Sequence, residues 1–247
     1  MNDGLLTKRV IFPMAGKGGV GKTTVVATLA EWYKSQKIQV ELLDMDVENR
    51  AEGSLSAMFA SAIKMPAVDT KTYDRLLGIS MESEADVILA DMGAAQAYKM
   101  IPWVRDFYQA AQNSGIPLRW TAIGVVDTDI ASARSVLEWG VALQRTVDYI
   151  VVHNNCPAGT PSAWEDAMIA DDVEQFRKTL SPVEIRMEAR RPDMQEMMRA
   201  RCVTLGDVAD RKTKVRELLA PELMLRARTY RTAAFKEFTK AHMVLLP

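Results

Sequence analysis

One stretch of the sequence decides the fold, Gly16-Lys17-Gly18-Gly19-Val20-Gly21-Lys22-Thr23-Thr24. Its spacing, G-x-x-x-x-G-K-[ST], is that of a phosphate-binding loop, and it lies between an apolar run at 10–14 and an amphipathic helical pattern at 23–37. Glycines let the backbone wrap around an anion, and the start of a helix adds positive potential. We therefore expect Lys22 to reach the β- and γ-phosphates of a nucleotide and the Thr23 hydroxyl to bind Mg²⁺. The alternative is a glycine-rich turn with incidental lysines.

Around this loop the sequence alternates between apolar runs and helical patterns. Apolar runs typical of strands that are buried on both faces occur at 38–43, 87–90, 120–126, 149–152 and 183–187. Helical periodicity appears between them at 69–77, 102–112 and 130–144, and again from 192 onward. This alternation predicts a three-layer α/β fold with a doubly wound, mostly parallel sheet. We expect a single domain over 1–247, in which 221–243 forms either a C-terminal arm or a covering helix.

The composition excludes several classes of protein. Of the 247 residues, 48% are hydrophobic and 26% are charged, which is ordinary for a globular domain and argues against disorder. The net charge of −1 excludes a globally basic nucleic-acid coat. The two cysteines, Cys156 and Cys202, provide no disulfide framework and lack metal-ligand spacing. Because the N-terminus lacks a signal peptide's apolar core and no apolar run could span a bilayer, we expect a cytoplasmic protein without stable membrane insertion.

Acidic residues follow two of the predicted strands. Asp44 and Asp46 end the run that begins at 38, and Asp91 ends the run at 87–90, two residues before Gly93. In a parallel sheet the carboxyl ends of the strands line the ligand crevice, so these side chains are expected to face the nucleotide. The alternative for Asp44 and Asp46 is a capping or solvated acid.

The form Lys-Gly-Gly-Val-Gly-Lys-Thr-Thr, from Lys17 to Thr24, resembles the deviant Walker A box of the ParA/MinD family of ATPases, of the SIMIBI class. The resemblance extends from about 8 to 193. It implies that Gly16 to Thr24 bind ATP, and that Lys17 reaches across a nucleotide-sandwich homodimer to the phosphates of the partner. The alternative for Lys17 is a solvated surface lysine.

The same resemblance assigns roles to the acids. Asp46 would orient the attacking water, which makes it catalytic together with Lys17 and Lys22, because phosphoryl transfer depends on positioning. Asp44 would support the Mg²⁺ shell or the loop. Asp91 would hold Mg²⁺ through water, since Mg²⁺ keeps much of its hydration shell, and Gly93 would let the backbone turn towards the γ-phosphate. The segment 47–50 departs from the Pro-Gln-Gly-Asn common in plasmid ParA proteins.

A base pocket is expected at the end of the run at 149–152. Family members often place an asparagine there to bind adenine, so Asn154 is the candidate and Asn155 the reserve. An asparagine that caps a loop is the alternative. The acid of a guanine-specific Asn-Lys-x-Asp motif is missing, which favours ATP over GTP. A second wall is expected around 190–193, without individual roles, and the histidines His153 and His242 need no catalytic role.

The C-terminal segment is basic. From 210 to 247 it holds nine Lys or Arg and four Asp or Glu, a net +5. Apolar residues recur there at helical spacing, so one interpretation is a packed helix with a solvated basic face. The other is a surface for non-specific double-stranded DNA, with Arg226, Arg228 and Arg231 as its candidate contacts.

The resemblance implies an ATP-dependent dimerisation switch with a protein partner that stimulates hydrolysis. The chain's size and its Asp-Met-Gly form at 91–93 suggest the TraL/StbB/MobD-like group, linked to plasmid partition, stability or conjugative transfer. Two alternatives have the same fold: an ATP-dependent small-molecule ligase of the dethiobiotin-synthetase type, and a nucleotide-binding scaffold that does not hydrolyse ATP.

Overall fold

The computed structural model describes residues 7–14, 16–46, 53–65, 70–94, 97–114, 117–157, 159–210 and 221–247. Two features of the sequence lie outside this range. One is the segment 47–50, where the sequence departs from plasmid ParA proteins. The other is the first part of the basic C-terminal segment, at 211–220.

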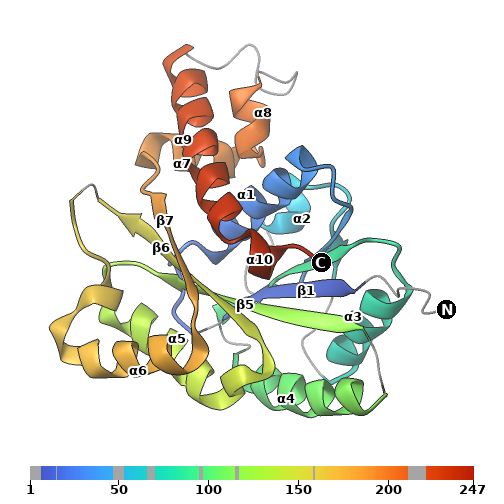
Figure 1. Cartoon of the computed structure of the whole chain (residues 1–247). Helices are drawn as coiled ribbons and strands as arrows, with labels where there is room; N and C mark the ends of the chain where they lie inside the picture. The colour runs from blue at the N-terminus through green and yellow to red at the C-terminus, as the bar shows by residue number, and fades with distance from the viewer. Residues whose placement is uncertain are drawn as a thin grey trace.

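A sheet of seven strands lies at the centre of the molecule (Figure 1). Its order is β3-β2-β4-β1-β5-β6-β7, and every neighbouring pair is parallel. The chain runs from β1 to β2 and β3 on one side, returns to β4 beside β1, and then adds β5, β6 and β7 on the other side, which confirms the predicted doubly wound α/β fold. The strands are β1 (Lys8–Pro13), β2 (Val40–Asp44), β3 (Ile63–Lys64), β4 (Val87–Asp91), β5 (Leu118–Val126), β6 (Asp148–Cys156) and β7 (Val183–Glu188).

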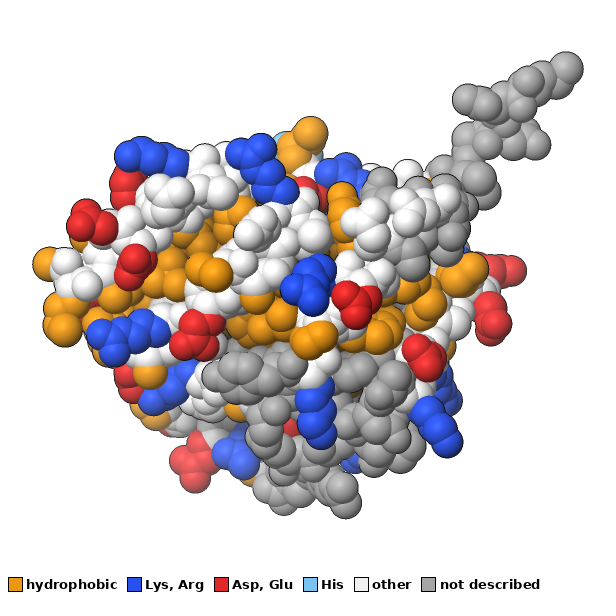
Figure 2. Space-filling view, turned by 90° about the horizontal axis from the view of Figure 1, so that it is seen from below, with side chains coloured by type: hydrophobic (Ala, Val, Ile, Leu, Met, Phe, Trp, Pro, Cys, Tyr) orange, Lys and Arg blue, Asp and Glu red, His pale blue; other side chains and the backbone are white. Residues whose placement is uncertain are grey.

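Helices cover both faces of the sheet (Figure 1). On one face lie α1 (Lys22–Ser35), α2 (Leu55–Met58), α7 (Pro192–Ala200), α8 (Leu205–Ala209), α9 (Pro221–Lys240) and α10 (His242–Leu245). On the other lie α3 (Thr70–Glu82), α4 (Ala97–Ser114), α5 (Ile130–Leu143) and α6 (Ala170–Leu180). Hydrophobic side chains gather in an elongated band on this second face (Figure 2). They include Val141 and Met168, which are 77% and 76% exposed beside a groove between α5 and α6.

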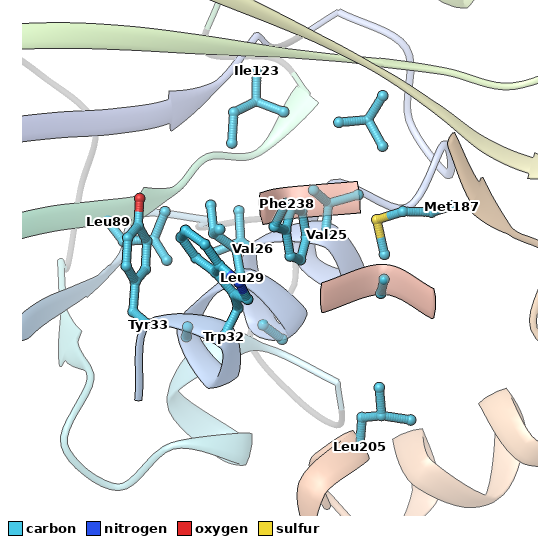
Figure 3. Close-up of a cluster of buried hydrophobic side chains, with 14 of the residues drawn as sticks. Val25, Val26, Leu29, Trp32, Tyr33, Leu89, Ile123, Met187, Leu205 and Phe238 are labelled. Carbon is cyan, nitrogen blue, oxygen red and sulfur yellow. The ribbon is translucent and has the colours of Figure 1, made fainter. Parts of the chain in front are cut away.

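The central strands are largely apolar because both of their faces are buried. In β1, Val10 and Phe12 join the core under α3 to α6, whereas Ile11, between them, joins the core under α1 and α9. Figure 3 shows the second of these cores, in which Trp32 of α1 packs against Phe238 of α9 with ring centroids 6.1 Å apart. Burial of such large rings is a main source of stability for this layer.

Several elements differ from the sequence-based expectation. The two-residue strand β3 and the helices α2 and α6 were not anticipated. Helix α4 begins at Ala97, although its start was expected at Pro102, which lies inside the helix. Proline at the first helical turn is the common case, and it misled the prediction here.

The C-terminal end is held against the sheet. The backbone carbonyls of Val244, Leu245 and Leu246 accept hydrogen bonds from the side chains of Thr121, Tyr33 and Arg9, each 2.6 Å long. The 221–243 segment forms α9 and the start of α10, and α9 packs on α1, α8 and β7. Among the described residues, no helix is both long and apolar enough to cross a membrane.

Candidate nucleotide site

The glycine-rich loop joins β1 to α1. Gly16, Gly19 and Gly21 have φ values of 144°, 79° and 94°, which side chains rarely adopt. A Cβ on Gly21 would lie 2.3 Å from the amide nitrogen of Asn154, so only glycine fits there. Gly21 is also the N-cap of α1, and no side chain caps this helix. The first N–H groups of α1 therefore have no capping side chain, as an anion-binding helix start requires.

Two cavities meet at this loop and share Gly19, Gly21, Thr23 and Thr24. The smaller, of about 380 Å³, is also lined by Lys22, Asp46, Met92 and Ala94. The larger, of about 690 Å³, extends along α1 to the loop after β7 and to α7. If the loop holds phosphates, as its sequence predicts, the smaller cavity suits the γ-phosphate end of a nucleotide and the larger one suits the nucleoside.

The two lysines of the loop lie in different environments. Lys22 is buried, and its ammonium donates a 2.7 Å hydrogen bond to the carbonyl of Lys17, so its charge stays inside the loop. Lys17 pairs with Asp129, the N-cap of α5, at 2.5 Å, with side chains 36% and 45% exposed. This pairing raises the pKa of Lys17 and lowers that of Asp129. In the single chain Lys17 is therefore held by an acid of its own subunit.

Asp91 is the most perturbed carboxylate of the site. It is 1% exposed, and neither of its oxygens has a hydrogen-bond partner. Burial, with added repulsion from Asp46 and Asp44, raises its pKa to about 7. Lys22 and the Thr23 hydroxyl oppose this shift; Thr23 is close enough to lower the pKa but is not aligned as a hydrogen-bond donor.

An orphaned buried carboxylate beside a hydroxyl fits a bound cation, because the cation would supply the missing partner. Thr23 and Asp91 are thus the residues that would hold Mg²⁺. In the described part of the chain, no three His, Cys, Asp or Glu side chains gather into a metal site of their own. Phosphate and water oxygens would have to complete the shell, as is usual for Mg²⁺.

The two acids after β2 have separate surroundings. Asp46 lines the smaller cavity, and a Cβ on Gly93 would lie 2.5 Å from one of its carboxylate oxygens. The loops that follow β2 and β4 therefore touch, and the glycine is required for this approach.

Asp44 is 1% exposed and does not line the smaller cavity. One oxygen accepts a 2.9 Å bond from the backbone N–H of Ser56, and the other accepts a 3.3 Å bond from the N–H of Asp46. These bonds match support of the loop, which is one of the two roles expected for Asp44. Ser56 was missed, since nothing in the sequence connects it to Asp44.

The two asparagines near the end of β6 have different surroundings. Asn154 is 1% exposed and donates a 2.8 Å hydrogen bond to the carbonyl of Val20, so it holds the backbone of the phosphate loop in place. The amide of Asn155 also reaches the Val20 carbonyl, at 3.5 Å, because a positive φ of 57° and a register shift interrupt the end of β6. Of the candidate and the reserve for the base contact, Asn155 is the one that lines the larger cavity.

The wall expected around 190–193 is present. Arg190 and Pro192 line the larger cavity, and the guanidinium of Arg190 donates a 2.6 Å hydrogen bond to the Thr28 hydroxyl. The histidines lie elsewhere: His153 contacts Ser162 and Glu184, and His242 contacts a backbone carbonyl.

The described part of the basic C-terminal segment is largely engaged in packing. Arg228 donates a 2.7 Å bond to the carbonyl of Ala209, and Arg231 forms a two-pronged ion pair with Asp210 at 2.8 and 2.9 Å. Both contacts hold α9 on α8. Two of the three arginines considered as DNA contacts therefore have structural partners.

Comparison with known proteins agrees with this geometry. A family model described as the CobQ/CobB/MinD/ParA nucleotide binding domain matches residues 11–200. Among solved structures, the chain is similar to the MinC:MinD cell division protein complex of Aquifex aeolicus, with a TM-score of 0.52, 19% identity and coverage of 94% of this chain and 96% of that chain. It is also similar to the MinD cell division protein of Aquifex aeolicus, with a TM-score of 0.50, 17% identity and coverage of 94% and 97%. No curated protein sequence gives a match.

Proposed function

The chain belongs to the CobQ/CobB/MinD/ParA family of nucleotide-binding domains, and from that premise we propose that it is an ATPase that acts as a dimerisation switch. The observation that carries the proposal is the meeting of Lys22, Thr23, Asp46 and Asp91 at one end of a phosphate-loop cavity. A loop that only bound phosphate would need Lys22 and Thr23 alone. The two acids add a cation site and a group that can align water.

In this proposal each side chain has one task. The N–H groups of the loop and the Lys22 ammonium hold the β- and γ-phosphates. Mg²⁺, when bound at Thr23 and Asp91, would neutralise charge on the phosphate oxygens. Asp46 accepts a hydrogen bond from a water in line with the γ-phosphate and so fixes its direction of attack. Gly93 lets the loop after β4 approach Asp46 in the loop after β2. Loss of the γ-phosphate would therefore change the conformation of both loops.

The nucleoside is proposed to lie in the larger cavity, between Asn155 and the Arg190–Pro192 loop. Adenine is favoured because no acid follows Asn155 in the pattern that guanine recognition uses. An amide side chain offers a donor and an acceptor to the edge of the base.

The decisive experiment compares ATP binding with ATP hydrolysis. Lys22→Ala should abolish binding, because the charge on the β- and γ-phosphates is lost. Asp46→Ala should keep binding and slow hydrolysis on the order of 10²-fold, since only positioning is lost. Asp106→Ala, which removes an acid that is 76% exposed on α4, is the matched control. Normal turnover by Asp46→Ala would exclude Asp46 from the mechanism.

Lys17 carries the dimerisation part of the proposal. In an ATP-bound homodimer it would exchange Asp129 for the phosphates of the partner subunit. A protein partner that stimulates hydrolysis would then release the dimer. An absence of hydrolysis with intact ATP binding would favour the scaffold function, and turnover that depends on a small carboxylate would favour the ligase.

For the cellular process we propose plasmid partition, stability or conjugative transfer, supported by the Asp91-Met92-Gly93 sequence after β4. The test is ATPase activity with and without double-stranded DNA, at two salt concentrations. DNA that acts through phosphate contacts should stimulate only at low salt, because counterion release makes binding salt-dependent. Arg226→Glu is the appropriate variant, since Arg228 and Arg231 hold α9 in place. Equal activity with and without DNA would shift the proposal to a protein cargo.

A further inference from the structure

We propose that Tyr230 of the C-terminal helix positions Arg190 in the wall of the nucleotide cavity, so that α9 is part of the nucleotide site. The inference rests on the proposed function, because it assumes that the larger cavity takes the nucleoside of ATP. It assigns to α9 a role that neither its basic charge nor its packing suggests.

The guanidinium of Arg190 is fixed by two contacts of different kinds. Its terminal nitrogen donates to the Thr28 hydroxyl on α1 at 2.6 Å, and its central carbon lies 4.6 Å from the centroid of the Tyr230 ring. The hydrogen bond holds one nitrogen of the guanidinium, whereas its central carbon lies over the Tyr230 ring. Together the two contacts position a group that lines the cavity.

Tyr230 makes this contact with its ring. The residue is 6% exposed and belongs to the buried stripe of α9, together with Ala227, Ala234 and Phe238. Its hydroxyl is buried and has no hydrogen-bond partner. Because an unpaired buried hydroxyl stabilises nothing, the aromatic face accounts for the interaction with Arg190. Phenylalanine at position 230 should therefore still hold Arg190, whereas an aliphatic side chain should not hold it.

A competing partner for Arg190 lies nearby. Glu31 is close to one turn along α1 from Thr28, and its carboxylate accepts a 2.6 Å bond from the N–H of Gly206. Burial raises the pKa of Glu31, and the charge of Arg190 counteracts that rise, so the two side chains attract each other. Without the Tyr230 ring, this attraction would favour a guanidinium turned towards Glu31 and away from the nucleoside.

The experiment measures the affinity of the full chain for ATP and for inorganic tripolyphosphate, both with Mg²⁺. Tripolyphosphate has the phosphates but lacks the nucleoside. Tyr230→Leu should weaken ATP binding about three- to tenfold, the range expected for loss of a partly desolvated cation–π contact. Tripolyphosphate binding should change by less than about twofold, because the phosphate loop is untouched. Tyr230→Phe should restore the ATP affinity.

Two further variants separate positioning from stability. Phe238→Leu removes an aromatic ring from the same buried stripe of α9 without touching Arg190, so both affinities should stay near the wild-type values. Arg190→Lys keeps the charge but loses the planar group, and should give the same selective loss as Tyr230→Leu. The double variant should be no weaker than either single one, because both remove the same contact.

Several results would overturn the proposal. Unchanged ATP affinity in Tyr230→Leu, or in Arg190→Lys if Tyr230→Leu does not fold, would refute the role of the pair. Equal losses for ATP and tripolyphosphate, or the same loss in Phe238→Leu, would show that α9 contributes only stability. Failure of the wild-type protein to bind ATP would instead refute the proposed function, and this inference with it.

Discussion

Asp91→Asn should stabilise the nucleotide-free protein above neutral pH, although it removes a residue proposed to hold Mg²⁺. The carboxylate is buried without a hydrogen-bond partner, and its pKa is raised from 3.8 to about 7. Asparagine has nearly the same shape and carries no charge, so it resembles the protonated acid. The variant thus removes the cost of burying a negative charge.

The magnitude follows from the shift in pKa. Between pH 3.8 and about 7 the folded protein keeps a proton on Asp91 that the unfolded chain has released, so this group's contribution to stability falls as the pH rises. The cost is complete above about pH 7 and amounts to roughly 4 kcal/mol as an upper limit. For a chain of this size that corresponds to a melting temperature higher by on the order of 10 °C.

The assay is denaturant unfolding of wild type and Asp91→Asn at pH 5 and pH 8, with a chelator present to remove divalent cations. The stability advantage of the variant should be roughly 2 kcal/mol at most at pH 5 and should grow towards pH 8. Asp106→Asn, which removes an exposed acid on α4, controls for the change in net charge. An advantage that is equal at both values, or a variant less stable than wild type at pH 8, would refute the reasoning. Mg²⁺ with ATP should then stabilise wild type more than the variant.

Three further predictions concern the loop and its neighbours. Lys17→Ala should stay monomeric in sedimentation with ATP, whereas wild type should dimerise; a dimer of equal strength would exclude the cross-subunit contact. Asp129→Asn releases Lys17, so the dimer should form at lower protein concentration. The melting temperature should change little, because an exposed ion pair contributes only about 0–1 kcal/mol. An unchanged dimerisation curve would show that the ion pair does not control dimerisation. Asn154→Ala should lower stability by about 1–3 kcal/mol, because it removes the brace under the loop. Asn155→Gly, which can keep the positive φ of 57°, should instead weaken ATP binding; the reverse pattern would restore Asn154 as the base contact.

The sequence by itself determined the features that depend on local spacing. The glycine loop with the lysine and threonine that open α1, and the acids at the ends of β2 and β4, are each encoded in a run of a few residues. The alternation of apolar runs with segments of helical periodicity then predicted the parallel sheet, because strands buried on both faces are nearly all apolar. The prediction failed at the start of α4, because Pro102 was assigned to the first helical turn, where proline is frequent, although it lies inside the helix.

Only the tertiary structure decided which of these side chains meet. Lys17 and Asp129 are brought together because β1 and β5 are neighbours in the sheet, so their carboxyl ends lie side by side. The different surroundings of Asn154 and Asn155 depend on the irregular end of β6, where Asn155 has a positive φ of 57° and the register with β7 shifts. Arg190 meets Thr28 across 162 positions of sequence, and Tyr230 joins them only because α9 packs beside α1. Such contacts have no local signature, because packing between distant elements sets the distance and direction of both side chains.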